Sequence, residues 1–137
     1  MKKKVKNIIL LAHGGAGAYA ANKRQLQSLA EAITTGYGLL QKGQSSLDAV
    51  KEVILHLENS ALFNAGSGAY LQLDQHARMD ASLMEGKHLQ AGAVAGLEGF
   101  ANPIEAACLV MKKTTHVLLA SEGAKRFAKF NKLKKSA

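Results

Sequence analysis

Residues 8–19 read IILLAHGGAGAY, an apolar run followed by three glycines within four positions. The run is apolar on both faces that a strand would present, so positions 7–12 predict a strand buried inside a layered fold. The glycines at 14, 15 and 17 predict a tight turn from that strand into a helix, because bare backbone bends most freely. Spacing alone leaves open whether the turn is a plain connection or lines a site.

The rest of the chain alternates between helical and strand-like periodicity, without an internal linker or repeat. Two successive helices follow the glycine turn, then a meander of strands, and then a helix, a buried strand and a last helix. The expected elements are, in order, a helix from Asn22 to about Gln41, a helix capped by Ser45 or Ser46, strands at 69–73, 78–84 and 88–97, a helix opened by Asn102-Pro103, a strand at 116–120 and a helix from Ser121. We therefore expect one α/β unit over residues 1–137, with basic tails at 1–6 and 131–137.

Each predicted helix carries apolar residues at three- and four-residue spacing, and these positions predict its buried face. They are Leu26, Leu29, Ala30, Ile33, Tyr37 and Leu40 in the first helix, Leu47, Val50, Ile54 and Leu57 in the second, Ile104, Ala107, Cys108 and Met111 in the third, and Ala124, Phe127 and Ala128 in the last. Cys108 is the only cysteine, which excludes an intrachain disulfide and a cysteine-based zinc site. Its apolar neighbours predict a buried hydrophobe rather than a reactive thiol.

The formal net charge of +8 is concentrated at the two ends of the chain. Ten of the eighteen basic residues lie within 2–6 and 125–135, whereas positions 7–124 carry eight basic and ten acidic side chains, a formal charge of −2. Basic ends can bind acidic partners, but no interleaved aromatic residues mark a surface for stacking bases, so we expect no nucleic-acid binding. No apolar run approaches the roughly 20 residues that span a membrane, and the opening run is too short for a signal peptide. We therefore expect a cytoplasmic protein.

Several familiar site motifs are matched only in part. Positions 15–20 fit the glycine fingerprint of a dinucleotide fold, but a second helix follows where that fold needs a strand. Positions 38–45 resemble a phosphate loop that has Gln44 in place of the essential lysine. The five histidines are scattered without metal-ligand spacing, and the GSG at 66–68 lacks the spacing of a nucleophile elbow. Asp80 and Glu85 bracket one predicted strand, where turn-capping and surface roles are expected.

The stretch at 62–69, LFNAGSGA, sets one amide side chain among small residues between a helix end and a strand. Such a loop can pack tightly while it aims one polar group and several carbonyls inward. Spacing alone supports this interpretation and a plain connection about equally.

Taken in order, five stretches together resemble one family. They are HGGAGAY at 13–19, LENSALFNAGSGA at 57–69, MDASLMEG at 79–86 with AGAVAGL at 91–97, NPIEAACLVM at 102–111 and THVLLASEGAKRFA at 115–128. The family is the isoaspartyl peptidase/L-asparaginase group, also called plant-type asparaginases, within the N-terminal nucleophile hydrolases. Its members resemble one another in making a precursor that cuts itself before a threonine. The resemblance therefore implies an α+β layered fold, the α-subunit half of an αββα sandwich.

The activity that the resemblance implies is amide hydrolysis, releasing aspartate from the small molecules L-asparagine and β-aspartyl dipeptides without an organic cofactor. The nucleophile is then a threonine freed at the start of a β subunit, and an (αβ)2 assembly is implied. The G-T-[VI]-G segment that supplies this threonine is absent from this sequence, whose four threonines lie in other contexts. Either a separate β chain accompanies this one, or the chain is a truncated and inactive piece. As an alternative function, such a fragment would bind acidic partners through its basic tails.

The site residues also follow from the resemblance. Asn64 matches the asparagine beside the nucleophilic threonine, which implies a supporting and orienting role, and the backbones of Gly14 and Gly15 match the turn that passes under that threonine. A side chain on this turn is expected to collide with the threonine. Ala61 stands where many members carry proline, which predicts a less rigid loop. Backbone carbonyls that wrap a sodium or potassium ion are implied at Leu57, Glu58, Ser60, Phe63, Ala65 and Ser67.

Overall fold

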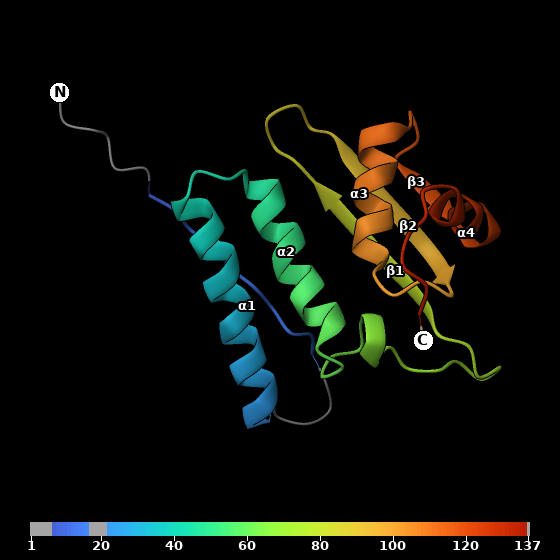
Figure 1. Ribbon diagram of the computed structural model, residues 1–137, viewed down its shortest axis with the longest axis horizontal. Helices are drawn as coiled ribbons and strands as arrows, with labels where there is room; N and C mark the ends of the chain where they lie inside the picture. The colour runs from blue at the N-terminus through green and yellow to red at the C-terminus, as the bar shows by residue number, and fades with distance from the viewer. Residues whose placement is uncertain (1–6, 17–21, 137) are drawn as a thin grey trace.

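The computed structural model describes residues 7–16 and 22–136, and its elements form two groups (Figure 1). Helices α1 and α2 lie side by side, and next to them a small sheet is covered by α3 and flanked by α4. The elements are α1 (Lys23–Gln41), α2 (Ser46–Asn59), a 3₁₀ turn η1 (Gly66–Gly68), β1 (Arg78–Met84), β2 (Ala91–Glu98), α3 (Pro103–Lys113), β3 (Leu118–Ala120) and α4 (Ser121–Phe130). This is the predicted α+β arrangement. None of the helices in the described ranges is long and apolar enough to cross a bilayer.

The helices begin where their capping residues predict. Asn22 and Gln25 form a reciprocal capping box at the start of α1, with two side chain to backbone hydrogen bonds of 3.0 Å. At the start of α2, the Ser45 hydroxyl accepts a hydrogen bond of 3.1 Å from the backbone N–H of Asp48. Helix α3 begins at Pro103, whose missing N–H is no loss in a first turn.

The sheet has the order β1-β2-β3, in which β1 and β2 are antiparallel and β2 and β3 are parallel. The register of β1 against β2 shifts between Met79 and Ala81. At this irregularity the Asp80 carboxylate accepts a hydrogen bond of 2.7 Å from the backbone N–H of Gly96, so Asp80 bridges two strands rather than capping a turn. Glu85, just after β1, accepts hydrogen bonds from two backbone N–H groups of the following turn, as predicted.

Helix α3 supplies the centre of the hydrophobic core. A Cβ atom on Gly92 of β2 would lie 2.3 Å from the carbonyl oxygen of Ala107, so only glycine allows the strand to approach α3 this closely. In α4, Ala124 and Ala128 are buried and Phe127 packs against the core, which confirms the predicted face. The predicted face of α3 is also confirmed, because its four buried members are Ile104, Ala107, Cys108 and Met111.

Small residues make the contact between α1 and α2, which corrects the predicted face of α1, whereas Leu47 and Ile54 of the predicted α2 face pack against the core. The buried residues of α1 are Ser28, Ala32 and Gly36. A Cβ atom on Gly36 would lie 2.5 Å from Cγ2 of Val53 in α2, so the two helices meet closely at this point. The larger side chains flank the contact, and four predicted core positions are exposed: Leu26, Ala30, Tyr37 and Val50. The apolar stripe was visible in the sequence, but the smallest residues decide where two helices approach.

Two predicted strands are absent from the described residues, at 7–12 and 69–73. Leu11 is 88% exposed, and Leu73 is fully exposed. A strand exists only when a neighbouring strand takes up its backbone hydrogen bonds, and within the described ranges neither segment has such a neighbour. The predicted strand at 116–120 forms only as the short β3, and its expected burial is wrong because Leu118 is 53% exposed.

Residues 131–136, predicted as a charged tail, fold back onto the domain. Lys135 forms an antiparallel bridge with Phe100, and the backbone N–H of Ala101 donates a hydrogen bond of 2.9 Å to the carbonyl of Lys134. Leu133 packs against the core. The segment is therefore docked along 99–101 despite its charge. The other predicted tail, residues 1–6, lies outside the described residues.

Candidate functional site

The two loops singled out in the sequence meet at one cavity of about 410 Å³. The glycine turn lines one part of it, and the loop after α2 lines another. Gly14 and Asn64, which the resemblance assigns to one site, both contribute to the wall. The lining residues are Ala12, His13, Gly14, Gly15, Ala16, Gln25, Leu26, Leu29, Leu62, Phe63, Asn64 and Tyr70.

The loop that carries Asn64 is fastened at its start. The hydroxyl of Ser60, the residue just after α2, donates a hydrogen bond of 2.8 Å to the carbonyl of Leu57. From α1, Gln25 Nε2 donates one of 2.9 Å to the carbonyl of Leu62. Ala61 lies between these two attachments with φ of +55°, a value that the proline ring excludes. The loop therefore follows a backbone path that a proline at position 61 could not follow.

Asn64 points its two polar atoms to different places. Its Oδ1 accepts a hydrogen bond of 2.9 Å from the backbone N–H of Tyr70. Its Nδ2 donates to none of the residues in the described ranges, and the side chain is exposed. The first bond holds the amide plane, so the amide nitrogen is available as an oriented donor.

One contact and one backbone conformation within this chain explain two glycines of the turn. A Cβ atom on Gly14 would lie 2.7 Å from Cε1 of Phe63, so the ring of the second loop occupies the space of a side chain. Gly15 adopts φ of +96°, and its N–H donates a hydrogen bond of 2.9 Å to His13 Nδ1. Nothing lies within 4 Å of a Cβ atom on Gly15, so its conformation rather than its surroundings demands glycine. The remaining glycine, Gly17, lies outside the described residues.

The loop after α2 folds over its own carbonyl groups. The carbonyl of Glu58 accepts a hydrogen bond of 2.9 Å from the Ser67 hydroxyl, and the carbonyl of Phe63 accepts one of 2.7 Å from the N–H of Ala65. Gly66 makes the closure possible, since a Cβ atom there would lie 2.2 Å from the Glu58 oxygen. Each carbonyl oxygen keeps a second lone pair for another partner.

These carbonyls fit an alkali cation by their chemistry. Hard cations prefer oxygen donors, and a loop of backbone carbonyls supplies them without particular side chains. In residues 7–16 and 22–136 there is no group of three or more His, Cys, Asp or Glu side chains that could hold another metal. The ion site at 57–67 stays a prediction.

Glu58 is a site residue whose side chain the sequence interpretation missed. It is 2% exposed, and burial raises the pKa of its carboxyl to about 7, although hydrogen bonds from Asn102 and Ile104 act in the opposite direction. The available signal was an acid in the last turn of an amphipathic helix, followed later by the helix start Asn102-Pro103. A buried carboxylate commonly finds free amide groups at such a start.

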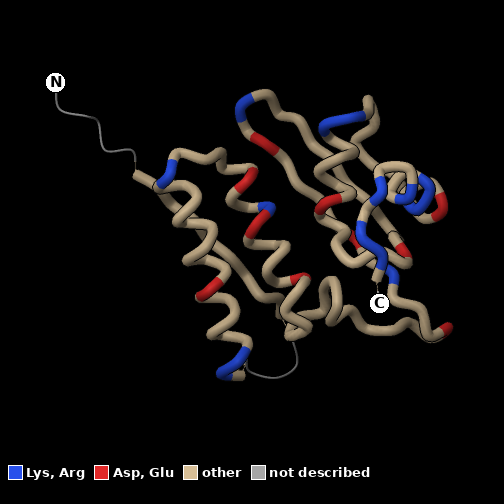
Figure 2. The backbone as a smooth tube through the Cα atoms, viewed as in Figure 1, with Lys and Arg blue, Asp and Glu red and all other residues tan. Residues whose placement is uncertain are grey.

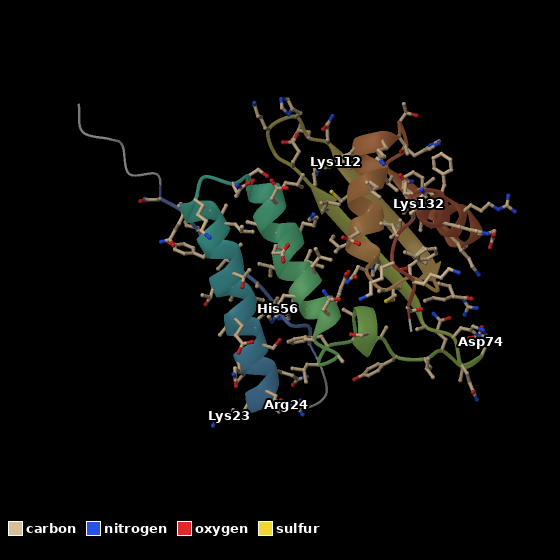
Figure 3. All side chains as sticks on the ribbon, in the orientation of Figure 1. Lys23, Arg24, His56, Asp74, Lys112 and Lys132 are labelled. Carbon is tan, nitrogen blue, oxygen red and sulfur yellow. The ribbon has the colours of Figure 1, made fainter. Side chains whose placement is uncertain are left out.

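Three histidines lie beside acids: His56, His76 and His88. His56 Nε2 on α2 lies 4.0 Å from Glu31 Oε2 on α1. Figure 3 labels Asp74 in the loop before β1. Asp74 lies beside His76 and forms an ion pair of 2.7 Å with Arg78. These pairs join neighbouring segments and do not converge on the cavity.

Basic side chains gather at the C-terminal end of the described chain. Figure 2 shows Lys and Arg clustered on α4 and on the segment that follows it, whereas basic and acidic residues are scattered over the rest of the described chain. Part of this charge is neutralised locally, because Lys125 Nζ lies 3.6 Å from Glu98 and Arg126 pairs with Glu122 at 3.3 Å.

The helix-covered mixed sheet, with its glycine turn and asparagine loop, is the α+β architecture of an N-terminal nucleophile hydrolase. The family model described as "Asparaginase" matches residues 6–136, and the chain belongs to this family. It is 49% identical to the plant-type L-asparaginase of Pyrococcus furiosus over 125 residues, which are 89% of this chain and 40% of that protein. It is 44% identical over 125 residues to the isoaspartyl peptidase/L-asparaginase of Homo sapiens, covering 89% of this chain and 41% of that protein. The chain thus spans about two fifths of the length of these relatives.

Proposed function

We propose that the chain is the α subunit of an isoaspartyl peptidase/L-asparaginase. In this function it hydrolyses L-asparagine and β-aspartyl dipeptides together with a β subunit that begins with the nucleophilic threonine. The observation that carries the proposal is the shared cavity of Gly14 and Asn64, the two positions that the family resemblance assigns to the site. Membership of the asparaginase family supports the reaction class.

The residues of this chain prepare a place for a reacting group that another segment brings. The freed threonine attacks the amide carbon with its hydroxyl, and its own α-amine takes the proton. Asn64 holds its amide donor in a fixed orientation through Tyr70 and steadies the threonine. The bare backbone at Gly14 lets the second loop close against the turn.

The open surfaces of the chain support the need for a second segment. Ile9 is 78% exposed, and Leu118 on the last strand is 53% exposed. Exposed apolar segments and strand edges of this kind are normally covered by another part of the protein. The proposal assigns this role to the β subunit, formed by self-cleavage of a common precursor and paired in an (αβ)2 assembly.

The proposal is tested by measuring activity of the chain with and without a partner chain and by determining the masses of the chains in the active material. The purified chain alone, a 14.5 kDa species, is expected to have no asparaginase activity, and activity should appear only with a chain that begins with threonine. Intact-mass spectrometry of the active material identifies both chains. The encoding reading frame after Ala137 is expected to continue into a G-T-[VI]-G segment, or a separate gene must supply one. Full activity of the 14.5 kDa chain by itself would overturn the proposal.

A further inference from the structure

Glu58 joins α2 to two other parts of the molecule. It lies in the last turn of α2 and is one of the largest fully buried side chains. Its carboxylate reaches the start of α3, and its carbonyl reaches the loop that carries Asn64. We call the carboxylate connection the side-chain arm and the carbonyl connection the backbone arm. Because both belong to Glu58, a shift of α2 against α3 also shifts the loop that carries Asn64.

The side-chain arm ends at the start of α3. Glu58 Oε1 accepts a hydrogen bond of 3.1 Å from the backbone N–H of Ile104, and Oε2 accepts one of 3.0 Å from Asn102 Nδ2. Asn102 is the N-cap residue but makes no side-chain cap of its own helix. Its amide also donates to Asn59 Oδ1 at 3.0 Å. The carboxylate of α2 therefore takes over the capping of α3, where the helix dipole favours negative charge.

The backbone arm ends at the Asn64 loop. The Glu58 carbonyl accepts the Ser67 hydroxyl at 2.9 Å, and Gly66 packs directly on the same carbonyl. Ser67 and Gly66 belong to η1, which follows Asn64 and leads to Tyr70, the residue that holds the Asn64 amide. Glu58 and Asn64 also line one common cavity of about 410 Å³, separate from the cavity of the glycine turn. Asn64 thus lies between the two cavities.

From this geometry we propose that Glu58 is a positioning residue for the reaction: its carboxylate fixes α2 against α3, and its carbonyl thereby fixes the loop that aims Asn64. The inference rests on the proposed function, since it concerns the same site. It assigns the Glu58 side chain a role distinct from that of an ion-binding carbonyl.

The chemistry of the junction makes it sensitive to substitution. Among the described residues, every hydrogen bond to the carboxylate comes from a neutral donor, and no Lys or Arg forms an ion pair with it. A glutamine would present an NH2 group to one of the two donors, so one bond is lost and two donors face each other. The junction must then shift, and the Asn64 loop shifts with it.

The experiment compares three variants in the complete assembly of this chain with its threonine-bearing partner. Glu58→Gln alters the hydrogen bonds of the side chain to Asn102 and Ile104, and Ser67→Ala removes the hydrogen bond to the Glu58 carbonyl. Glu105→Gln is the matched control. Glu105 is an acid in the first turn of α3, the turn that the Glu58 carboxylate caps, but its side chain makes no hydrogen bond to the Asn64 loop. Turnover of L-asparagine is measured as kcat per folded molecule, with the folded fraction determined by native mass spectrometry.

We expect Glu58→Gln to lower kcat by about tenfold or more and to change KM by less than about threefold, because misplacing a positioning group acts on the reacting geometry. Ser67→Ala should lower kcat in the same way but less, and Glu105→Gln should leave kcat unchanged. A purely structural Glu58 would lower the folded fraction and leave kcat per folded molecule intact. If Glu58→Gln does not assemble, Ser67→Ala carries the test.

The possible failures are distinguishable. An active wild-type assembly with unchanged kcat in Ser67→Ala and in folded Glu58→Gln would overturn this inference alone. An inactive wild-type assembly would overturn the proposed function, and the inference with it.

Discussion

Gly14 lies against the ring of Phe63 so closely that a Cβ atom would stand 2.7 Å from Cε1. This contact joins the N-terminal turn to the loop after α2, two segments about fifty positions apart in the sequence. It shows that the chain itself requires bare backbone at position 14, before any partner segment is considered.

Replacing Gly14 with alanine should therefore push the Phe63 ring out of place. We expect a loss of about 1 to 3 kcal/mol in the free energy of unfolding, the usual range for overpacking, together with reduced turnover. Thermal melting and asparaginase assays of the assembled protein measure both. The double variant Gly14→Ala with Phe63→Leu should recover part of the stability; no recovery would show that the ring is not the obstacle.

Asn64→Ala should reduce turnover far more than stability. Its side chain is exposed and, within the described part of the chain, makes one hydrogen bond, to Tyr70 N–H, so the loss of stability should be about 1 kcal/mol or less. Loss of an orienting group near the reacting atoms should lower kcat by about tenfold to a hundredfold. Chemical denaturation and steady-state kinetics on one preparation compare the two effects. Proportional losses in both would return Asn64 to the role of a plain loop residue.

The buried carboxyl of Glu58 should make stability depend on pH. Its pKa is raised from 4.5 to about 7 by burial, so between these values the native state keeps a proton that the unfolded state has lost. Stability therefore falls as pH rises through this window and levels off above it. The groups around Glu58 are Glu105 on α3, whose charge raises the pKa further, and Arg78 and Asp80 on β1, which line the same cavity.

The Glu58→Gln variant has no titrating carboxyl at position 58. Comparing it with the wild type therefore isolates the contribution of the Glu58 carboxyl to the pH dependence of stability. The stability difference, wild type minus variant, should shrink by about 3 kcal/mol between pH 4.5 and 7. Chemical denaturation of the assembled proteins at several pH values measures it. A difference that stays constant with pH would contradict a raised pKa at this position.

Ser121 joins β3 to α4 in a conformation that serine seldom adopts, with φ of +45°. Ser121→Gly should stabilise the protein by about 0.5 to 1 kcal/mol, because glycine reaches this region without steric strain. Ser121→Ala is the matched control and should bring no gain, since alanine keeps the Cβ atom. Melting temperatures of the three proteins decide the matter, and equal values would show that position 121 is unstrained.

The chain purified without a partner should self-associate. Its exposed apolar side chains include Ile9 and Leu11, on an N-terminal segment that pairs with no strand of residues 22–136, and Leu118 on the last strand. Uncovered apolar edges of this kind drive aggregation. Light scattering coupled to size exclusion gives the mass distribution; a monodisperse monomer with a cooperative melt would refute this expectation.

Local chemistry made most of the helices predictable. The capping residues Asn22 and Ser45 and the proline at 103 all act within one turn, so the starts of α1, α2 and α3 could be found from sequence alone. The core face of α3 was also correct, because its apolar residues recur at helical spacing. The strands at 7–12 and 69–73 were wrong for the opposite reason: a strand depends on a distant partner that a pattern of side chains does not contain.

The features of the candidate site also separate into those that local sequence predicts and those that depend on contacts between distant segments. The sequence by itself determined the family, the glycine turn and the asparagine loop, because each motif is an order of neighbouring residues and does not depend on tertiary contacts. Only the tertiary structure decided that Phe63 fills the space above Gly14, that Glu58 caps a helix 46 positions away, and that residues 131–136 dock beside Phe100. Each of these is a contact between segments far apart in the chain, and such contacts arise only when the folded backbone brings the two surfaces together.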